Sequence, residues 1–252
     1  MNIHNRGKYL ISFGLLILIG TIVIISSSTT DVHASNKADK TIILASEFIK
    51  ENPYLLSQCV QTVEDSFNIS DETLAWVNDI PISIEEFNFR QGLKKVIGDK
   101  DQDDKSVFNI LVEEKIILDF AIKNNIVPTN SELEEFIAYE SNIDNTGQEY
   151  KDMVELICKY AEMSEEEYYN TYEKYNAFRV LLLKNAYDYA IKNGQQNGHL
   201  AIDNEDDAFA EQHEKITYWY DVKKELKNTA IIKIDEKHEE FGIILDTAKI
   251  YK

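Results

Sequence analysis

The sequence predicts a mainly helical, multi-helix domain whose N-terminal and C-terminal parts are joined by a small two-stranded β element. Three observations predict this class. The 252 residues include only 3 prolines and 9 glycines, and this scarcity of breakers favours long helices. Apolar residues recur at spacings of three and four through most of the chain. Two short β-rich stretches interrupt this pattern, LAWV at 74–77 and TAIIKID at 229–235.

Composition and charge narrow the class of protein. A hydrophobic content of 44% is ordinary for a folded chain and argues against wholesale disorder. The formal net charge of -19 argues against nucleic-acid binding, which needs a basic face. It fits a soluble, solvated acidic surface, or partners that are basic.

Residues 1–34 have the organisation of a signal peptide or signal anchor. Arg6 and Lys8 precede the apolar run 10–25, and Val-His-Ala at 32–34 forms a small-residue cleavage site. We predict cleavage after Ala34. The alternative is an uncleaved membrane anchor through residues 10–25, because the run is intermediate in length between a signal and a span. Either way the rest is exported, to the outer face of a bacterial cytoplasmic membrane or beyond it.

The exported part begins with a helical extension at 35–70. Its first helical piece carries an apolar face made of Ile42, Ile43, Ala45, Phe48 and Ile49. Pro53 starts the second piece, and Asn68–Asp71 ends it.

The stretch LAWVNDIPISIEEF at 74–87 reads as a strand, a turn and a helix start. Asn78 and Asp79 form the turn, and Pro81 restricts the residues after this turn to a sheet edge. Ser83 and Glu86 have the spacing of a capping box. A lone strand is unstable, so LAWV should pair with TAIIKID, the other clear β-rich stretch before the tail.

Helices fill the interval between these strands. The segment 106–124 is apolar nearly all round and should be central and buried. Thr129 with Glu132 and Ser164 with Glu167 form two further capping boxes, and the second starts the longest helix, at about 165–192. A polar linker at 193–207 precedes a last helix at 208–226. The tail 236–252 could add a strand or hairpin.

An aromatic stripe runs along the longest helix at spacings of three and four. Its members are Tyr168, Tyr172, Tyr175 and Phe178. They are candidate peptide contacts, because Tyr offers apolar area and a hydrogen-bonding tip. The alternative is that the stripe packs the helix against its neighbours.

Motifs for catalysis, cofactors and metals are not evident. The sequence has no G-x-S-x-G, H-E-x-x-H, Walker loop or G-x-G-x-x-G. Adjacent acidic residues such as Glu113 and Glu114 point in different directions on a helix and make poor carboxylate pairs. Cys59 and Cys158 lack metal spacing, and either remain separate thiols or form one disulfide. We therefore predict a protein that is not an enzyme and uses no cofactor.

The order of these elements resembles the N-terminal chaperone domain of SurA and the related PrsA foldases, and more loosely the client-binding region of trigger factor. The resemblance rests on three segments: VNDIPISIEEF (77–87), VEEKIILDFAIKNNIVPTNSELEEFI (112–137) and WYDVKKELKNTAIIKI (219–234). It implies a helical chaperone domain at 71–235 that cradles unfolded or exported polypeptides. It also implies that the strand near Trp76 pairs with the strand near Ile231.

Two departures from the family pattern bear on function. The turn carries Asn78-Asp79 where family members usually have Asn-Gly. SurA and PrsA also carry a parvulin-type prolyl isomerase domain, which needs on the order of a hundred residues, where this chain has a short polar linker. The sequence leaves three hypotheses: a non-catalytic chaperone or holdase, a membrane-tethered interaction protein with one dedicated envelope or export partner, and an active prolyl isomerase, which the missing domain disfavours.

Overall fold

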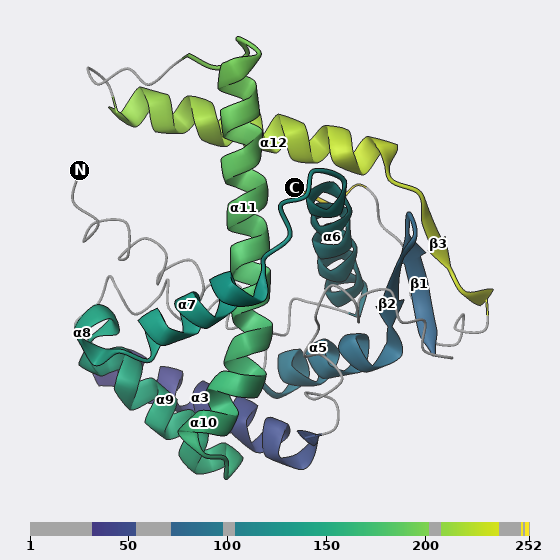
Figure 1. Cartoon of the computed structure of the whole chain (residues 1–252). Coiled ribbons are helices and arrows are strands. Elements are labelled where there is room, and N and C mark those ends of the chain that lie inside the picture. The colour runs from purple at the N-terminus through teal and green to yellow at the C-terminus, as the bar shows by residue number, and fades with distance from the viewer. Residues whose placement is uncertain are drawn as a thin grey trace. The chain divides into compact units, whose positions relative to one another are not determined.

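The computed structural model describes residues 32–53, 72–97, 104–201, 208–236, 248, 250 and 251. The described chain is mainly helical with a small three-stranded antiparallel sheet (Figure 1). It divides into two compact units that interleave along the sequence. Unit 1 takes the described residues within 1–62, 85–102 and 129–180, and unit 2 those within 63–84, 103–128 and 181–252. The predicted domain 71–235 is thus shared between both units.

Unit 1 is built from helices. They are α3 (Val32–Glu51), α5 (Ile84–Ile97), α7 (Asn130–Glu140), α8 (Ile143–Thr146), α9 (Gln148–Ala161), α10 (Glu165–Tyr168), the π-helical segment η2 (Tyr169–Glu173) and the first part of α11 (Lys174–Gln196). The predicted capping boxes of Thr129 with Glu132 and of Ser164 with Glu167 are both confirmed. In each box the hydroxyl of the N-cap residue accepts a hydrogen bond from the backbone N–H of the glutamate three residues later. The glutamate side chain in turn accepts a hydrogen bond from the N-cap backbone N–H, so these two donors of the helix start are satisfied.

The predicted apolar face of the first helix packs in unit 1. Ile49 is buried, and Ile42, Ala45 and Phe48 pack beside it in the same core as Phe89 of α5 and residues of α9. Gly92 of α5 permits this packing, since a Cβ there would lie 2.2 Å from the Phe48 ring. The helix begins at Val32, earlier than predicted, and ends at Glu51.

Unit 2 contains the sheet, in the order β2-β1-β3 (Figure 1). Strand β1 (Thr73–Val77) pairs antiparallel with β3 (Ile232–Ile234), and Trp76 lies opposite Lys233. The predicted pairing of LAWV with TAIIKID is therefore confirmed. The two strands lie far apart in sequence, and they are joined because each needs the other's backbone groups to form a stable sheet.

The sequence predicted a two-stranded β element, and this prediction is wrong because the sheet has a third strand. Residues Ile80–Ser83 form β2, which pairs with the other side of β1. Ile80 and Ile82 alternate inward and are buried, which is the strand pattern that the proline obscured. Pro81 lies in an outer strand, as predicted, because a sheet edge tolerates the missing amide hydrogen.

Among the described residues of unit 2, the sheet is accompanied by α6 (Asp104–Lys123), the second part of α11 and α12 (Ala208–Thr229). The prediction that α6 is central is confirmed, because Phe108, Leu111, Val112, Ile116, Leu118 and Ala121 are all buried. Helix α11 extends to Gln196, which lies within the predicted linker.

Several predicted features lie outside the described residues. These are the export segment apart from 32–34, the second helical piece after Pro53, Cys59, the acidic run 203–207 and most of the tail. Cys158, which the structure does describe, carries a free thiol. Within the described ranges, none of the helices combines the length and the apolar character needed to cross a membrane.

Candidate polypeptide-binding surface

The aromatic stripe proposed from the sequence lies in the interior. Tyr168, Tyr172 and Tyr175 belong to the hydrophobic core of unit 1, and Phe178 is also buried. Tyr168 stacks on Tyr172 at 5.7 Å between ring centroids, and Tyr175 meets Phe89 edge to face. Buried side chains such as these offer no surface to a peptide. The structure thus corrects the peptide-contact interpretation and supports the packing alternative.

A π-helical turn within this stripe brings a carboxylate onto the buried face. In an α-helix, residues five apart point in different directions, but in a π-helix they align. The Tyr168 hydroxyl therefore donates to Glu173 Oε2 at 2.7 Å, across a separation of five residues. Asn176 Nδ2 donates to the other oxygen at 3.2 Å. The α-helical spacing used in the sequence prediction placed Glu173 off the stripe, so it was missed.

Glu140, the last residue of α7, completes this buried cluster. It forms a side-chain hydrogen bond with Glu173, and the two residues are only 5% and 3% exposed. The pKa of Glu140 is raised from the ordinary 4.5 to about 10, mainly by burial and secondly by repulsion from the Glu173 charge. Two carboxyls in contact cannot both be ionised, so Glu140 carries the proton. Tyr150 and Tyr169 also lie close to this carboxyl pair.

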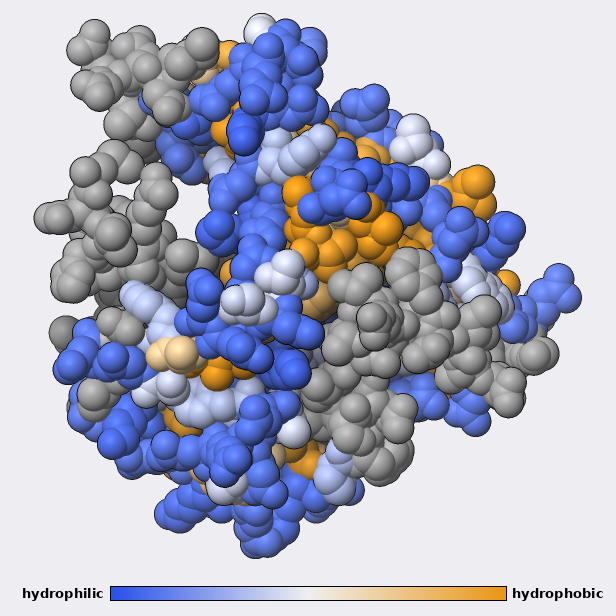
Figure 2. All heavy atoms as spheres, in the orientation of Figure 1, coloured by the Kyte–Doolittle hydropathy of each residue, from blue (hydrophilic) through white to orange (hydrophobic). Residues whose placement is uncertain are grey.

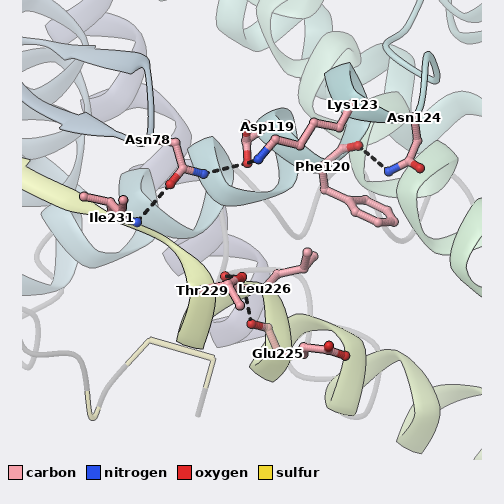
Figure 3. Close-up of polar contacts among 9 residues, drawn as sticks. All are labelled: Asn78, Asp119, Phe120, Lys123, Asn124, Glu225, Leu226, Thr229 and Ile231. Carbon is pink, nitrogen blue, oxygen red and sulfur yellow. Dashed lines mark hydrogen bonds and ion pairs between the residues drawn. The ribbon is translucent and has the colours of Figure 1, made fainter.

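Asn78 fixes the start of β3 in unit 2 (Figure 3). Its backbone N–H donates to the Ile231 carbonyl at 2.7 Å, and its Oδ1 accepts the Ile231 N–H at 2.9 Å. Its Nδ2 donates to Asp119 Oδ2 of α6 at 2.6 Å. Asn78 has φ 52°, in the left-handed region that Asn tolerates well, whereas Asp79 has no positive φ. The turn therefore does not require the Gly of the family pattern at position 79.

Helix α12 is anchored by two aromatic pairs, one to α11 and one to the turn that follows α11. Trp219 meets Tyr187 edge to face at 6.0 Å, and Tyr218 stacks on His199 at 6.3 Å. Gly194 of α11 allows the approach, since a Cβ there would lie 2.7 Å from the Tyr218 ring. These contacts fix which face of α12 turns inward and which faces solvent.

Helix α12 and the residue before β3 expose three large apolar side chains. Among the described residues, the exposed large hydrophobic ones are Ile216 (41%), Tyr220 (49%) and Ile231 (61%). We call these three residues the α12–β3 surface. Figure 2 shows hydrophobic surface over α6 and where α12 leads into β3. Because both backbone groups of Ile231 are bonded to Asn78, the exposure of its side chain is a fixed feature of unit 2.

Strand β3 also has backbone N–H and C=O groups that point away from β1. The Ile231 carbonyl and the Asp235 N–H both face β1, bonding Asn78 and Leu74. Strand residues alternate in direction, so Ile232 and Ile234 point their N–H and C=O groups to the opposite side. Among the described strands, β3 has a partner on one side only. Such an edge can accept a further strand.

Comparison with known proteins gives no family assignment. The chain matches no protein-family model, no curated protein and no solved structure. The functional proposal therefore rests on the residues of the α12–β3 surface themselves. The sequence did place Ile216 and Tyr220 among the apolar residues of the last helix, but it did not separate those facing solvent from Trp219, which is buried.

Proposed function

We propose that this protein is a non-catalytic chaperone, a holdase that binds unfolded or exported polypeptides outside the bacterial cytoplasm. The observation that carries the proposal is the α12–β3 surface, where Ile216, Tyr220 and Ile231 stay exposed in a unit with a well-buried core. Surface apolar side chains next to an outer strand suit a polypeptide that is itself apolar and extended.

The geometry suggests how a client would lie. Ile216 precedes the end of α12 at Thr229 by about 20 Å of helix, a length that about six extended residues cover. Beyond that point the client would add to the outer edge of β3, using the backbone groups of Ile232 and Ile234. Backbone pairing is independent of client sequence, which suits a protein with many clients.

Charge and the N-terminal segment support the same proposal. The net charge of -19 disfavours self-association and favours basic or neutral clients. The predicted export segment 1–34 would place the protein on the outer face of the membrane or release it. The β1–β3 pairing is the arrangement that the SurA-type resemblance implied, and it supports a domain of that kind.

Replacing the three surface residues by serine tests the proposal. Each removed apolar contact is worth about 1–1.5 kcal/mol, so the triple variant I216S/Y220S/I231S should bind clients at least about tenfold more weakly. The measurement is suppression of light scattering when a denatured client is diluted from guanidinium. Folding should be unchanged by circular dichroism, because the three side chains are exposed.

The matched control is the double variant T217S/N228S, which alters exposed polar positions on the same helix. It should protect the client as the unaltered protein does. Undiminished protection by the triple variant would exclude the α12–β3 surface as the client site. A single stoichiometric partner recovered in place of many weak clients would favour the dedicated-partner hypothesis.

A further inference from the structure

Two residues near the end of the chain, Ile250 and Tyr251, are docked within unit 2 against α6 and α12. The Ile250 side chain is fully buried, at 0% exposure. The Tyr251 backbone N–H donates to Glu113 Oε1 at 2.6 Å, and the Tyr251 hydroxyl donates to the Glu113 carbonyl at 2.8 Å. From α12, Lys227 Nζ donates to the Ile250 carbonyl at 3.1 Å.

The docking contacts have the form of peptide recognition. Two of the three hydrogen bonds use main-chain groups of the dipeptide, which any sequence supplies, while the apolar isoleucine side chain is completely buried. Main-chain bonds give affinity and buried side chains give selectivity in such sites. Burial raises the pKa of Glu113, and the hydrogen bond from the Tyr251 amide acts in the opposite direction, so the docked dipeptide favours the charged form of this carboxylate.

Aromatic contacts connect this site to the proposed client surface. Lys223 Nζ lies 5.0 Å from the Tyr251 ring centroid and 4.4 Å from that of Tyr220. It also lies 5.8 Å from the Trp219 ring. The lysine ammonium thus bridges the docked tyrosine and a member of the α12–β3 surface through cation–π attraction. A polypeptide that lies on Tyr220 comes within reach of the docking site.

Tyr251 has φ 53°, the left-handed conformation that bulky residues rarely adopt. Such a conformation persists where surrounding contacts hold it, and here the contacts are those with Glu113 and Lys223. The dipeptide is therefore held by the site and not by its own backbone preference. A segment held in this way can be displaced by a competing segment with equivalent contacts.

We propose that the site formed by Glu113, Lys223 and Lys227 is a second subsite for client polypeptide, selective for an aliphatic residue followed by an aromatic one. Ile250 and Tyr251 occupy it in cis. This inference rests on the proposed chaperone function and adds its selectivity and regulation. An intramolecular ligand acts at an effective concentration in the millimolar range, so a client segment must outcompete it. The occupied state holds the subsite closed until a client engages the neighbouring surface.

The test uses the peptide AKIYK, the sequence of residues 248–252, as a fluorescent probe in anisotropy titrations. Full-length protein with I250S/Y251S should bind the probe at least tenfold more tightly than the unaltered protein. Adding Glu113→Ala to that variant should abolish the gain. The control peptide IAKKY, with the same composition but the aliphatic and aromatic residues separated, should not bind.

Tyr251→Gly is a less disruptive variant, because it keeps Ile250 and because glycine adopts a positive φ without strain. Circular dichroism checks that Tyr251→Gly and I250S/Y251S are both folded. Folded variants that fail to bind the probe would overturn the inference. Unfolding of both variants would also overturn it, because the dipeptide would then be an indispensable part of the unit 2 core. If the AKIYK probe does not bind but I216S/Y220S/I231S still loses client protection, the second subsite is excluded and the chaperone proposal is unaffected.

Discussion

Replacing Glu140 with glutamine is expected to make the protein more stable at alkaline pH, by about 2–4 kcal/mol at pH 8. In the folded protein Glu140 holds a proton in contact with Glu173, and its pKa is raised by burial and by the Glu173 charge to about 10. In the unfolded chain the same carboxyl loses its proton near its ordinary pKa of 4.5. Glutamine keeps the shape, and its amide can donate to Glu173 without a titratable proton.

Proton counting gives the sign of this pH dependence. Between about pH 4.5 and pH 10 the folded state keeps the Glu140 proton and the unfolded state does not. Stability therefore falls as pH rises, by up to about 1.4 kcal/mol per unit for this group. Below pH 4.5 the stabilising contribution of Glu140 is fully present, because its carboxyl is protonated in both the folded and the unfolded state. The stability of the variant and that of the unaltered protein should therefore differ little at pH 5.

Urea unfolding followed by circular dichroism at pH 5 and pH 8 measures the effect. The comparison that matters is the variant minus the unaltered protein, since this difference removes the titration of other groups. Glu134→Gln is the matched control, because Glu134 is an exposed residue of the same helix, and it should change little at either pH. Equal pH dependence in the Glu140→Gln variant and the unaltered protein would show that Glu140 ionises normally in the fold.

Asn78→Ala is expected to destabilise unit 2 by about 2–4 kcal/mol. The substitution removes the bond to Asp119 and the bond from the Ile231 N–H, and it places alanine at φ 52°. Both tryptophans, Trp76 and Trp219, belong to unit 2. Intrinsic tryptophan fluorescence in a urea titration therefore reports this loss directly.

Two further variants locate the cause of that loss. Asn78→Gly accepts the positive φ but loses the side-chain bonds, so it should fall between the unaltered protein and Asn78→Ala. Asn197→Ala removes an exposed bond to Asn193 in the same unit and should cost less than about 0.5 kcal/mol. An Asn78→Ala variant as stable as Asn197→Ala would mean that the β1–β3 pairing does not depend on this side chain.

Local signals predicted much of the fold. The capping boxes at Thr129 and Ser164 depend on residues three apart, and the all-round apolar character of 106–124 placed α6 in the interior. The β1–β3 pairing was predictable because LAWV needed a partner and TAIIKID was the clear β-rich candidate before the tail. Strand β2 was missed because Pro81 masked the inward alternation of Ile80 and Ile82.

The buried Glu173 cluster and the α12–β3 surface were harder to predict, each for its own physical reason. A π-helical turn changes which residues share a face, so Glu173 could not be placed beside Tyr168 from α-helical spacing. In α12, apolar residues cover much of the circumference, and the pattern does not tell which of them face solvent. The pairs of Trp219 with Tyr187 of α11 and of Tyr218 with His199 after α11 decide this, and they depend on tertiary contacts such as the approach to Gly194.

Hydrogen–deuterium exchange of the full chain, with and without an unfolded client, tests most directly whether the α12–β3 surface binds clients. We expect slower exchange at the outward-facing amides of Ile232 and Ile234, and around Ile216 and Tyr220, when client is present. We expect no change across the buried stripe from Tyr168 to Phe178. Client-induced protection of the stripe, with β3 and α12 unchanged, would contradict the proposal and restore the stripe as the binding surface.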